Sequence, residues 1–335
     1  MSNDIENMDG EILAARGRLS EVAVLTPLVE SAAINALVGG RVLLKLENLQ
    51  HTGSFKFRGA YNKVASLSPG QLRDGIAATS SGNHAQAVAA VARRFGTSAV
   101  IGMPKDASPF KVARVRDFGA SIVRYDRYLD DESAVAQALV RDHKATLIPP
   151  FDDRLVIAGQ ASVALELYEQ AAARGVRIDA VIVPCGGGGL AAGTALATRY
   201  ASPGTRMFIV EPEHYNDTAL SLHAGTIVPN AMAKAHSTLC DALMSAHPGA
   251  LTFAVNRRFV ADAFTIADSH VREAVKILCR ELRLIVEPSG AVGLAALLAG
   301  NRPQAAECVA VIVSGGNIAL ETLTTLTSEV GNAAG

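Results

Sequence analysis

The chain has 335 residues, 49% of them hydrophobic and 19% charged, and its formal net charge at pH 7 is -1. This length predicts two domains around a large core, and the balanced charge argues against nucleic acid or an acidic membrane surface as a partner. The four cysteines lie far apart and show no C-x-x-C spacing, which argues against a disulfide framework and a structural zinc site.

No apolar run is long enough to cross a bilayer, and the N-terminal stretch MSNDIENMDGEILAARGRL lacks the apolar core of a signal peptide. We therefore expect a cytoplasmic protein with no membrane partner. Small metabolites are the expected ligands.

Short apolar, β-rich runs alternate with longer helical patterns along the chain. The first half predicts strands in RVLLKLE, GIAATS, SAVIGM and SIVRY, and helices from about residue 57 and over 82–95, 108–118 and 130–143. After residues 145–149 the pattern continues with a helix over 155–173, the strand DAVIVP, a helix from about residue 190, and the strands RMFIVE, FTIAD, LIVEP and CVAVIVS, each of the last three followed by a helical pattern. Strands that are apolar on both faces and alternate with helices predict an α/β fold with parallel sheets covered by helices.

The strongest motif is PCGGGGLAAG, residues 184–193, between a predicted strand and a predicted helix. Successive glycines let backbone N–H groups converge on an anion, and the helix N-terminus adds positive charge, so the motif predicts a phosphate site. A P-loop is excluded because Thr194 stands where its lysine should be. A dinucleotide fingerprint stays open, with Gly187-x-Gly189-x-x-Ala192 and Glu211 as the ribose-binding acid, which would indicate an NAD-dependent oxidoreductase.

A second loop, TSSGNHAQA at 79–87, also ends a predicted strand and opens a predicted helix. Ser80 or Ser81 can cap this helix, and Gly82 with Asn83 suits a tight turn whose backbone N–H groups could hold a carboxylate. We expect His84, in the first helical turn, to be structural.

Two further stretches complete the set. In GSFKFRGAYN, at 53–62, Lys56 lies between two phenylalanines, which predicts a partly desolvated amine with a lowered pKa. VIVSGGN, at 311–317, adds a hydroxyl group and two glycines after a strand. An amine, a phosphate cup, a carboxylate-binding turn and a neutral hydroxyl are together the requirements of a pyridoxal phosphate enzyme.

At these residues the chain resembles the fold-type II pyridoxal phosphate enzymes of the serine/threonine dehydratase and serine racemase group. The resemblance runs through TPLVES, KLENLQHTGSFKFRGA, TSSGNHAQA, PPFDDRLVIAGQ, the glycine run, EP at 211 and 212, LIVEPSGAVGLAAL and VSGGN, and so covers nearly the whole chain. It implies two open, mostly parallel sheets with flanking helices, as in the tryptophan synthase β-like fold. It also implies a large domain of residues 1–68 and 152–335, a small closing domain of residues 69–151, and a homodimer.

The resemblance also implies roles for single residues. Lys56 would bind pyridoxal 5'-phosphate covalently and act as the catalytic base, with Phe55 against the ring, Asn83 on the ring hydroxyl and Ser314 at the ring nitrogen. The phosphate would be held by Gly186, Gly187, Gly188 and Gly189. The substrate carboxylate would bind the turn formed by Ser80, Ser81, Gly82, Asn83 and His84.

A divalent cation, magnesium or calcium, is implied at Glu211, the Tyr215 carbonyl and Asp217, an all-oxygen set that suits a hard ion. The competing interpretation is that Asp217 caps a helix and Glu211 is solvated. The same Glu211 cannot also serve as a ribose-binding acid, and the resemblance favours the metal.

The implied activity is β-elimination that converts L-threonine, L-serine or a close 3-hydroxy amino acid to a 2-oxo acid and ammonia. Serine racemase is an alternative, because Ser81 matches a serine that faces the lysine across the cofactor in racemases, and 3-hydroxyaspartate dehydratase is another. The chain departs from many relatives at CDALMS, 240–245, where Ala242 replaces a glycine, so the substrate stays open. A non-catalytic amino-acid binder is the most distant alternative.

Overall fold

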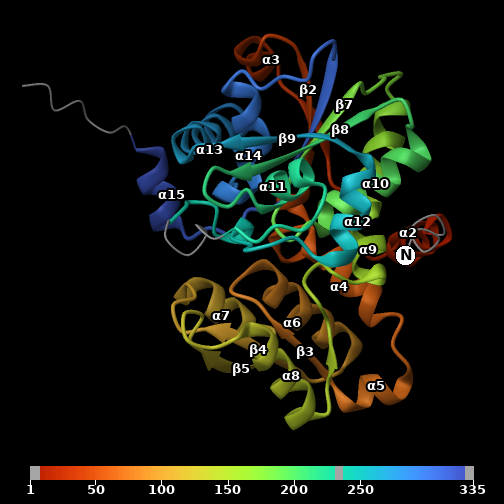
Figure 1. Ribbon diagram of the computed structural model, residues 1–335, viewed down its shortest axis with the longest axis vertical. Coiled ribbons are helices and arrows are strands. Elements are labelled where there is room, and N and C mark those ends of the chain that lie inside the picture. Colours follow the sequence, from red (N-terminus) through yellow and green to blue (C-terminus); the bar gives the residue numbers. More distant parts are fainter. Residues whose placement is uncertain (1–7, 231–236, 329–335) are drawn as a thin grey trace, which may run out of the picture.

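The computed structural model describes residues 8–230 and 237–328 and contains two sheets (Figure 1). The larger sheet has the strand order β1-β2-β10-β7-β8-β9, and the smaller has the order β5-β4-β3-β6. All neighbouring strands are parallel except β1 and β2, so the predicted α/β class with two mostly parallel sheets is confirmed. The strands of the larger sheet are β1 (Leu28–Glu30), β2 (Arg41–Leu46), β7 (Ala180–Pro184), β8 (Arg206–Pro212), β9 (Val260–Ile266) and β10 (Cys308–Val313).

The smaller sheet is built from one continuous part of the chain. Its strands are β3 (Ile76–Thr79), β4 (Ala99–Pro104), β5 (Ser121–Tyr125) and β6 (Thr146–Leu147). Its helices are α5 (Pro69–Asp74), α6 (Asn83–Phe95), α7 (Pro109–Asp117) and α8 (Glu132–His143). These elements lie together below the larger sheet in Figure 1. They all fall inside 69–151, while the division of the chain into two domains stays a prediction.

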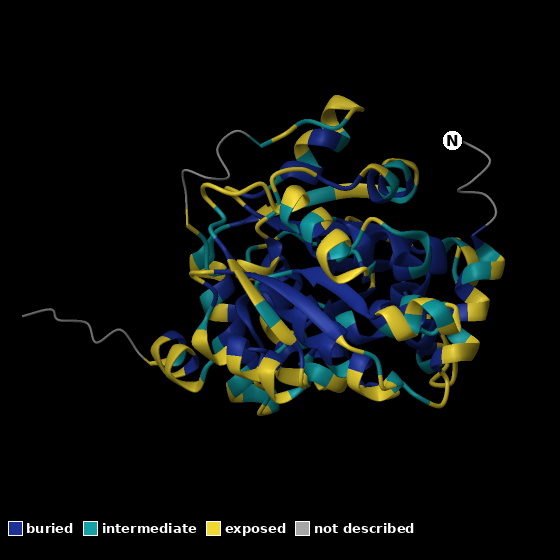
Figure 2. Cartoon of the chain, turned by 90° about the horizontal axis from the view of Figure 1, so that it is seen from below, coloured by how far each residue is buried: buried dark blue, intermediate teal, exposed yellow. Residues whose placement is uncertain are grey.

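Helices cover both faces of the larger sheet, which explains why its strands are apolar on both sides. Val181 and Val183 of β7 pack in one core with α9 (Arg154–Ala172) and α10 (Gly189–Ala201), while Ile182 packs in the other with α13 (Asp268–Leu282) and α14 (Pro288–Leu298). β7 and β10 are accordingly buried along their whole length, and Figure 2 shows buried strands surrounded by helices that are exposed on their outer sides. The remaining elements are α2 (Asp9–Leu19), α3 (Ala32–Val38), α4 (Lys56–Val64), α11 (Asp217–Ala224), α12 (Ala250–Phe259), α15 (Leu320–Thr327) and the 3-10 turns η1 (Glu47–Leu49), η2 (His51–Gly53) and η3 (Asp241–Leu243).

One predicted strand is wrong. Of the predicted strand LIVEP, 284–288, residues 284–287 lie between α13 and α14 without joining a sheet. Arg283 ends α13 in a left-handed conformation, and Pro288 begins α14, so the segment between them is too short and too constrained for a strand. β10 already has β2 and β7 on its two sides, so no edge beside it is free for this segment.

Within the described part of the chain, no helix combines the length and apolar character needed to span a membrane.

Candidate active site

Lys56 is the first residue of α4, and two contacts fix this helix start at the end of β10. The Phe55 N–H donates to the Ser314 carbonyl at 3.2 Å, and Ser54 forms an antiparallel bridge with Gly315. α4 then packs backbone against backbone on α9, because a Cβ added at Gly159 would lie 2.6 Å from the Arg58 carbonyl oxygen. Lys56 is therefore held at the carboxyl edge of the larger sheet, where open α/β sheets bind ligands.

A buried ionic network holds α4 in this place. The Arg58 guanidinium contacts Glu47 at 2.8 Å and Glu166 at 2.7 Å, and Glu166 also contacts the Lys45 amine at 3.0 Å. These residues come from β2, η1, α4 and α9. Because removing one member of a buried charged set leaves the others unpaired, the network ties the sheet and both helices together.

The Lys56 amine is partly desolvated, as the flanking phenylalanines predict. Its Nζ donates to the Pro150 carbonyl at 2.6 Å and lies 5.2 Å from the centroid of the Phe55 ring. Burial lowers the pKa of Lys56 from 10.5 to about 8. A substantial fraction of the amine is then neutral under mildly alkaline conditions and can act as a nucleophile or base.

The glycine loop, 186–189, has no room for side chains. A Cβ added at Gly187 would lie 2.3 Å from Phe151 Cδ1, and one at Gly189 would lie 2.9 Å from Phe151 Cβ. Gly188 has a φ of 91°, a left-handed conformation that favours glycine. The Gly187 carbonyl accepts from Thr252 Oγ1 at 2.7 Å, and α10 begins at Gly189. A loop without side chains at a helix N-terminus fits a phosphate group.

The second predicted loop differs in detail from expectation. Neither Ser80 nor Ser81 caps α6; the N-cap is Gly82, whose N–H donates to Ser80 Oγ at 3.1 Å. His84 is buried, and its Nε2 lies 2.8 Å from the Ile148 carbonyl, which requires a proton on that nitrogen. Burial, followed by the charge of Lys56, lowers the pKa of His84 to about 3, so His84 is neutral and cannot serve as a cationic acid near neutral pH.

Asn83 joins this loop to the segment before α14 and to the segment after β10. Its Nδ2 donates to Glu287 Oε1 at 2.5 Å, and its Oδ1 accepts from Asn317 Nδ2 at 2.8 Å. Ser314 is buried three residues before Asn317, directly after β10. The structure thus brings Lys56, Asn83 and Ser314 to one edge, and the Pro150–Phe151 segment links Lys56 to the glycine loop.

Glu211 and Asp217 are buried side by side at the end of β8. Glu211 accepts from the Thr218 N–H at 3.1 Å and the Ala219 N–H at 2.7 Å, whereas neither Asp217 carboxylate oxygen has a hydrogen-bond partner among the described residues. Burial raises the pKa of Asp217 to about 7, and burial together with the Asp217 charge raises that of Glu211. The interpretation of a solvated Glu211 and a capping Asp217 is wrong, because Glu211 is fully buried and α11 has no side-chain cap.

These carboxylates fit a hard cation, which would replace the missing partners of Asp217. The Tyr215 backbone lies between them in sequence, and its side chain is buried. In 8–230 and 237–328 no group of three or more His, Cys, Asp or Glu side chains is suited to a metal, so a cation here would rely on backbone oxygen and water as well.

Four further polar residues belong to this region. Glu287, Asn317 and Asp241 stand in the quoted motifs LIVEPSG, VSGGN and CDALMS, but no spacing rule marks them as functional. Lys111 of α7 has no sequence signal; it is buried, and its Nζ donates to Asp241 Oδ2 at 2.5 Å. A Cβ added at Gly82 would lie 3.3 Å from Lys111 Nζ, so this amine adjoins the predicted carboxylate-binding turn.

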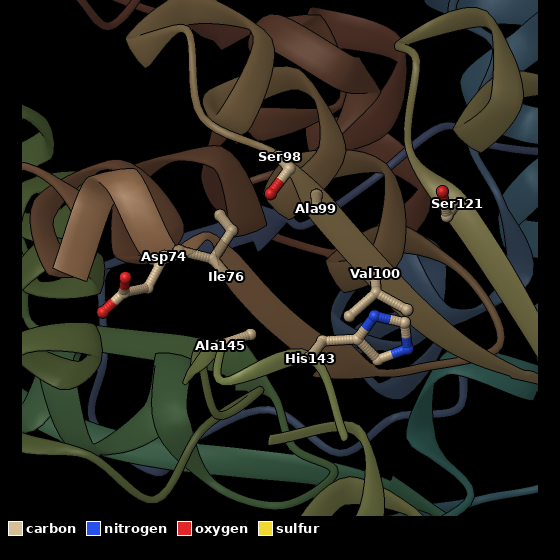
Figure 3. A pocket seen from close by; sticks show the side chains of 8 residues that line it. All are labelled: Asp74, Ile76, Ser98, Ala99, Val100, Ser121, His143 and Ala145. Carbon is tan, nitrogen blue, oxygen red and sulfur yellow. The ribbon is translucent and has the colours of Figure 1, made fainter. Parts of the chain in front are cut away.

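Two surface cavities lie away from Lys56. One, of about 120 Å³, is lined by Ile76, Ala99 and Ser121, the first residues of β3, β4 and β5, together with His143 and four others (Figure 3). This is the amino edge of the smaller sheet, opposite to the edge where ligands of parallel sheets bind. The other, of about 230 Å³, is bordered by Glu213 and Asp268 near the ends of β8 and β9.

The two sheets, the glycine loop and the desolvated lysine define an α/β enzyme that uses a phosphorylated carbonyl cofactor. The sequence profile described as pyridoxal-phosphate dependent enzyme matches residues 19–315. The chain belongs to this family, of fold type II, so the predicted resemblance is confirmed.

Among curated relatives, the chain is 40% identical to L-threo-3-hydroxyaspartate ammonia-lyase of Saccharomyces cerevisiae, covering 95% of this chain and 96% of the relative. It is 36% identical to serine racemase of Schizosaccharomyces pombe, covering 93% and 94%. It is 35% identical to catabolic L-threonine dehydratase of Escherichia coli, covering 96% of both chains.

Solved structures of named relatives have a similar fold. Maize serine racemase has a TM-score of 0.89 at 36% identity, covering 94% of this chain and 95% of the other. The serine racemase of Dictyostelium discoideum has a TM-score of 0.85 at 33% identity, covering 92% and 98%.

Proposed function

We propose that this chain is a pyridoxal phosphate dependent ammonia-lyase that converts L-threonine, L-serine or a close 3-hydroxy amino acid to a 2-oxo acid and ammonia. The observation that carries the proposal is the Lys56 amine, whose pKa is lowered to about 8 by burial at the edge that also holds the glycine loop and Asn83. The family and its ammonia-lyase members support the same reaction class.

The residues divide the work as follows. The glycine loop 186–189 would hold the phosphate of pyridoxal phosphate. Phe55 would contact its ring, Asn83 its ring hydroxyl and Ser314, as a neutral group, its ring nitrogen. When bound, pyridoxal phosphate supplies an electron sink for the electron pair left at the substrate Cα.

The Ser80–His84 turn orients the substrate by its carboxylate, and Lys56 removes the Cα proton. Loss of the 3-hydroxyl as water gives an enamine, which becomes an imine and is hydrolysed to the 2-oxo acid and ammonia. The enzyme thus consumes one water for each water that it eliminates.

The second candidate substrate is 3-hydroxyaspartate, because two relatives of 40% identity are named L-threo-3-hydroxyaspartate ammonia-lyases. A side-chain carboxylate needs a cationic partner, and Lys111 is a buried cation beside Gly82. Racemisation is the second candidate activity, with Ser81 as a proton donor opposite Lys56; it is favoured by relatives named serine racemase.

We further infer a magnesium or calcium ion at Glu211, Asp217 and the Tyr215 carbonyl, supported by the unpartnered Asp217 oxygens. From the family we also infer a cytoplasmic homodimer in which the residues 69–151 close over the site. Domain closure would exclude water from the reacting atoms.

The test is release of 2-oxo acid and ammonia from L-threonine, L-serine, D-serine and the 3-hydroxyaspartate isomers, with cofactor supplied and magnesium present or chelated. We expect the wild-type protein to release 2-oxo acid and ammonia from L-threonine or L-serine, and Lys56→Ala to release neither. A decrease in product release when magnesium is chelated would support the cation site. Ser81→Ala should reduce serine racemisation and D-serine turnover more than L-serine elimination. No product from any substrate, or full activity in Lys56→Ala, would overturn the proposal.

A further inference from the structure

Glu287 is a buried carboxyl group whose partners lead directly to the predicted cofactor contact at Asn83. It is 2% exposed and immediately precedes α14. Its N–H donates to the Gly315 carbonyl at 3.1 Å, and a Cβ added at Gly315 would lie 2.1 Å from Oε1. This carboxyl group is therefore packed into the loop that follows β10, beside Asn83.

Hydrogen bonding fixes the direction of the Asn83 amide. Asn317 Nδ2 donates to the Thr52 carbonyl at 2.7 Å and to Asn83 Oδ1 at 2.8 Å. A carbonyl can only accept, so the nitrogen of Asn317 must face Thr52, and both of its N–H groups are then used. Asn83 must in turn present its oxygen to Asn317 and its nitrogen to Glu287, which leaves Asn83 one N–H for a ligand.

The second oxygen of Glu287 is the unexplained atom. Oε2 is buried and has no hydrogen-bond partner among the described residues. A buried carboxylate oxygen without a partner is costly, so it indicates a missing proton or ligand contact.

Charges from two other elements face this group. Burial raises the pKa of Glu287 to about 7. The positive charge of Lys111 in α7 and the hydrogen bond from Asn83 lower this pKa, whereas the negative charge of Asp241 in η3 raises it further. The carboxyl group can therefore gain and lose a proton in the range in which enzymes work.

We propose that Glu287 is a positioning residue that aims the remaining Asn83 N–H at the ring hydroxyl of pyridoxal phosphate and, by its charge, sets the pH at which the bound cofactor changes its protonation state. This rests on the proposed cofactor site at Lys56. The negative charge of Glu287 near the cofactor favours the protonated form of the cofactor. Removing this charge should therefore let the cofactor lose its proton at a lower pH.

The experiment is a pH titration of the visible absorbance of the holoenzyme, together with the dissociation constant of pyridoxal phosphate. Glu287→Gln keeps an oxygen that can accept from Asn83 but removes the charge, so the absorbance transition should move down by about one pH unit. Asn317→Ala removes the anchor of the Asn83 amide and should weaken cofactor binding at least ~5-fold. Glu169→Gln makes the same chemical change on the exposed side of α9 and should leave both readouts unchanged.

The outcomes separate the two proposals. If the wild-type protein takes up no cofactor, the proposed function fails. If it does, but Glu287→Gln titrates like the wild type, the role of Glu287 fails. Should Glu287→Gln not fold, Glu287→Asp decides, because it keeps the charge but shortens the reach to Asn83; wild-type cofactor affinity in that variant would overturn the positioning role.

Discussion

At the scale of single residues, the lowered pKa of Lys56 should be visible in its chemistry without the cofactor. Burial lowers this pKa from 10.5 to about 8. The acetic anhydride labelling rate of Lys56, followed by peptide mass mapping of the cofactor-free protein, should therefore rise with a midpoint near pH 8. A midpoint near pH 10.5 would contradict the desolvation of the amine.

The same shift affects stability. Between about pH 8 and 10.5 the unfolded chain binds more protons at this lysine than the folded chain does, so the contribution of Lys56 to the free energy of unfolding rises with pH in that window. Lys56→Met should lose this dependence, which urea unfolding at several pH values can measure against the wild type.

The sequence alone predicts the environment of Lys56 but not the contacts of Glu287 and Asn317 with Asn83. The two phenylalanines beside Lys56 are local, and they correctly predict a desolvated amine. Glu287 and Asn317 contact Asn83 from 204 and 234 residues away in sequence. No local pattern carries such a contact, so the orientation of the Asn83 amide needs the folded chain.

At the scale of elements, the glycine loop gives the sharpest prediction. Gly187→Ala would push a methyl group into Phe151, at 2.3 Å, whereas Gly204→Ala meets nothing within 4 Å. Overpacking of this kind costs about 1–3 kcal/mol. We expect Gly187→Ala to lower cofactor affinity at least ~5-fold in equilibrium dialysis, and Gly204→Ala to bind like the wild type. Equal affinity in both variants would argue against a phosphate site at 186–189.

Element prediction succeeds where periodicity and flanking turns agree, as in β7 and α10 around the glycine run. It fails at LIVEP because three apolar residues resemble a strand, although the left-handed Arg283 and the helix-starting Pro288 leave only a connector. The sequence pattern records hydrophobicity, and burial between two helices produces the same hydrophobicity as burial in a sheet.

At the scale of the whole molecule, an ion pair near the site connects the elements of the smaller sheet to those of the larger one. Lys111 comes from α7, and Asp241 belongs to η3, whose Ala242 N–H donates to Ser289 Oγ in α14 at 3.0 Å. Although burial disfavours its charged form, Asp241 and Glu287 raise the pKa of Lys111. The pair therefore spans the two sheets beside the glycine loop, where closure of the predicted small domain would act.

We expect this pair to favour the closed arrangement of the two sheets. Lys111→Met and Asp241→Asn should each raise KM several-fold, and the double variant should be little worse than the more damaging single one, because both remove the same contact. The Asp241 side chain is 50% exposed, so salt should weaken the pair and raise the wild-type KM as well. Steady-state kinetics of all three variants at low and high ionic strength measure this coupling.

Asp106→Asn provides the matched control, because Asp106 pairs with Arg127 at 2.8 Å and both residues follow strands of the smaller sheet. This variant also loses one ion pair, but none that spans the sheets, so its KM should stay close to that of the wild type. Strictly additive effects of Lys111→Met and Asp241→Asn would contradict a joint role in closure. A KM increase in Asp106→Asn equal to theirs would instead assign the effect to the charge of the small sheet as a whole.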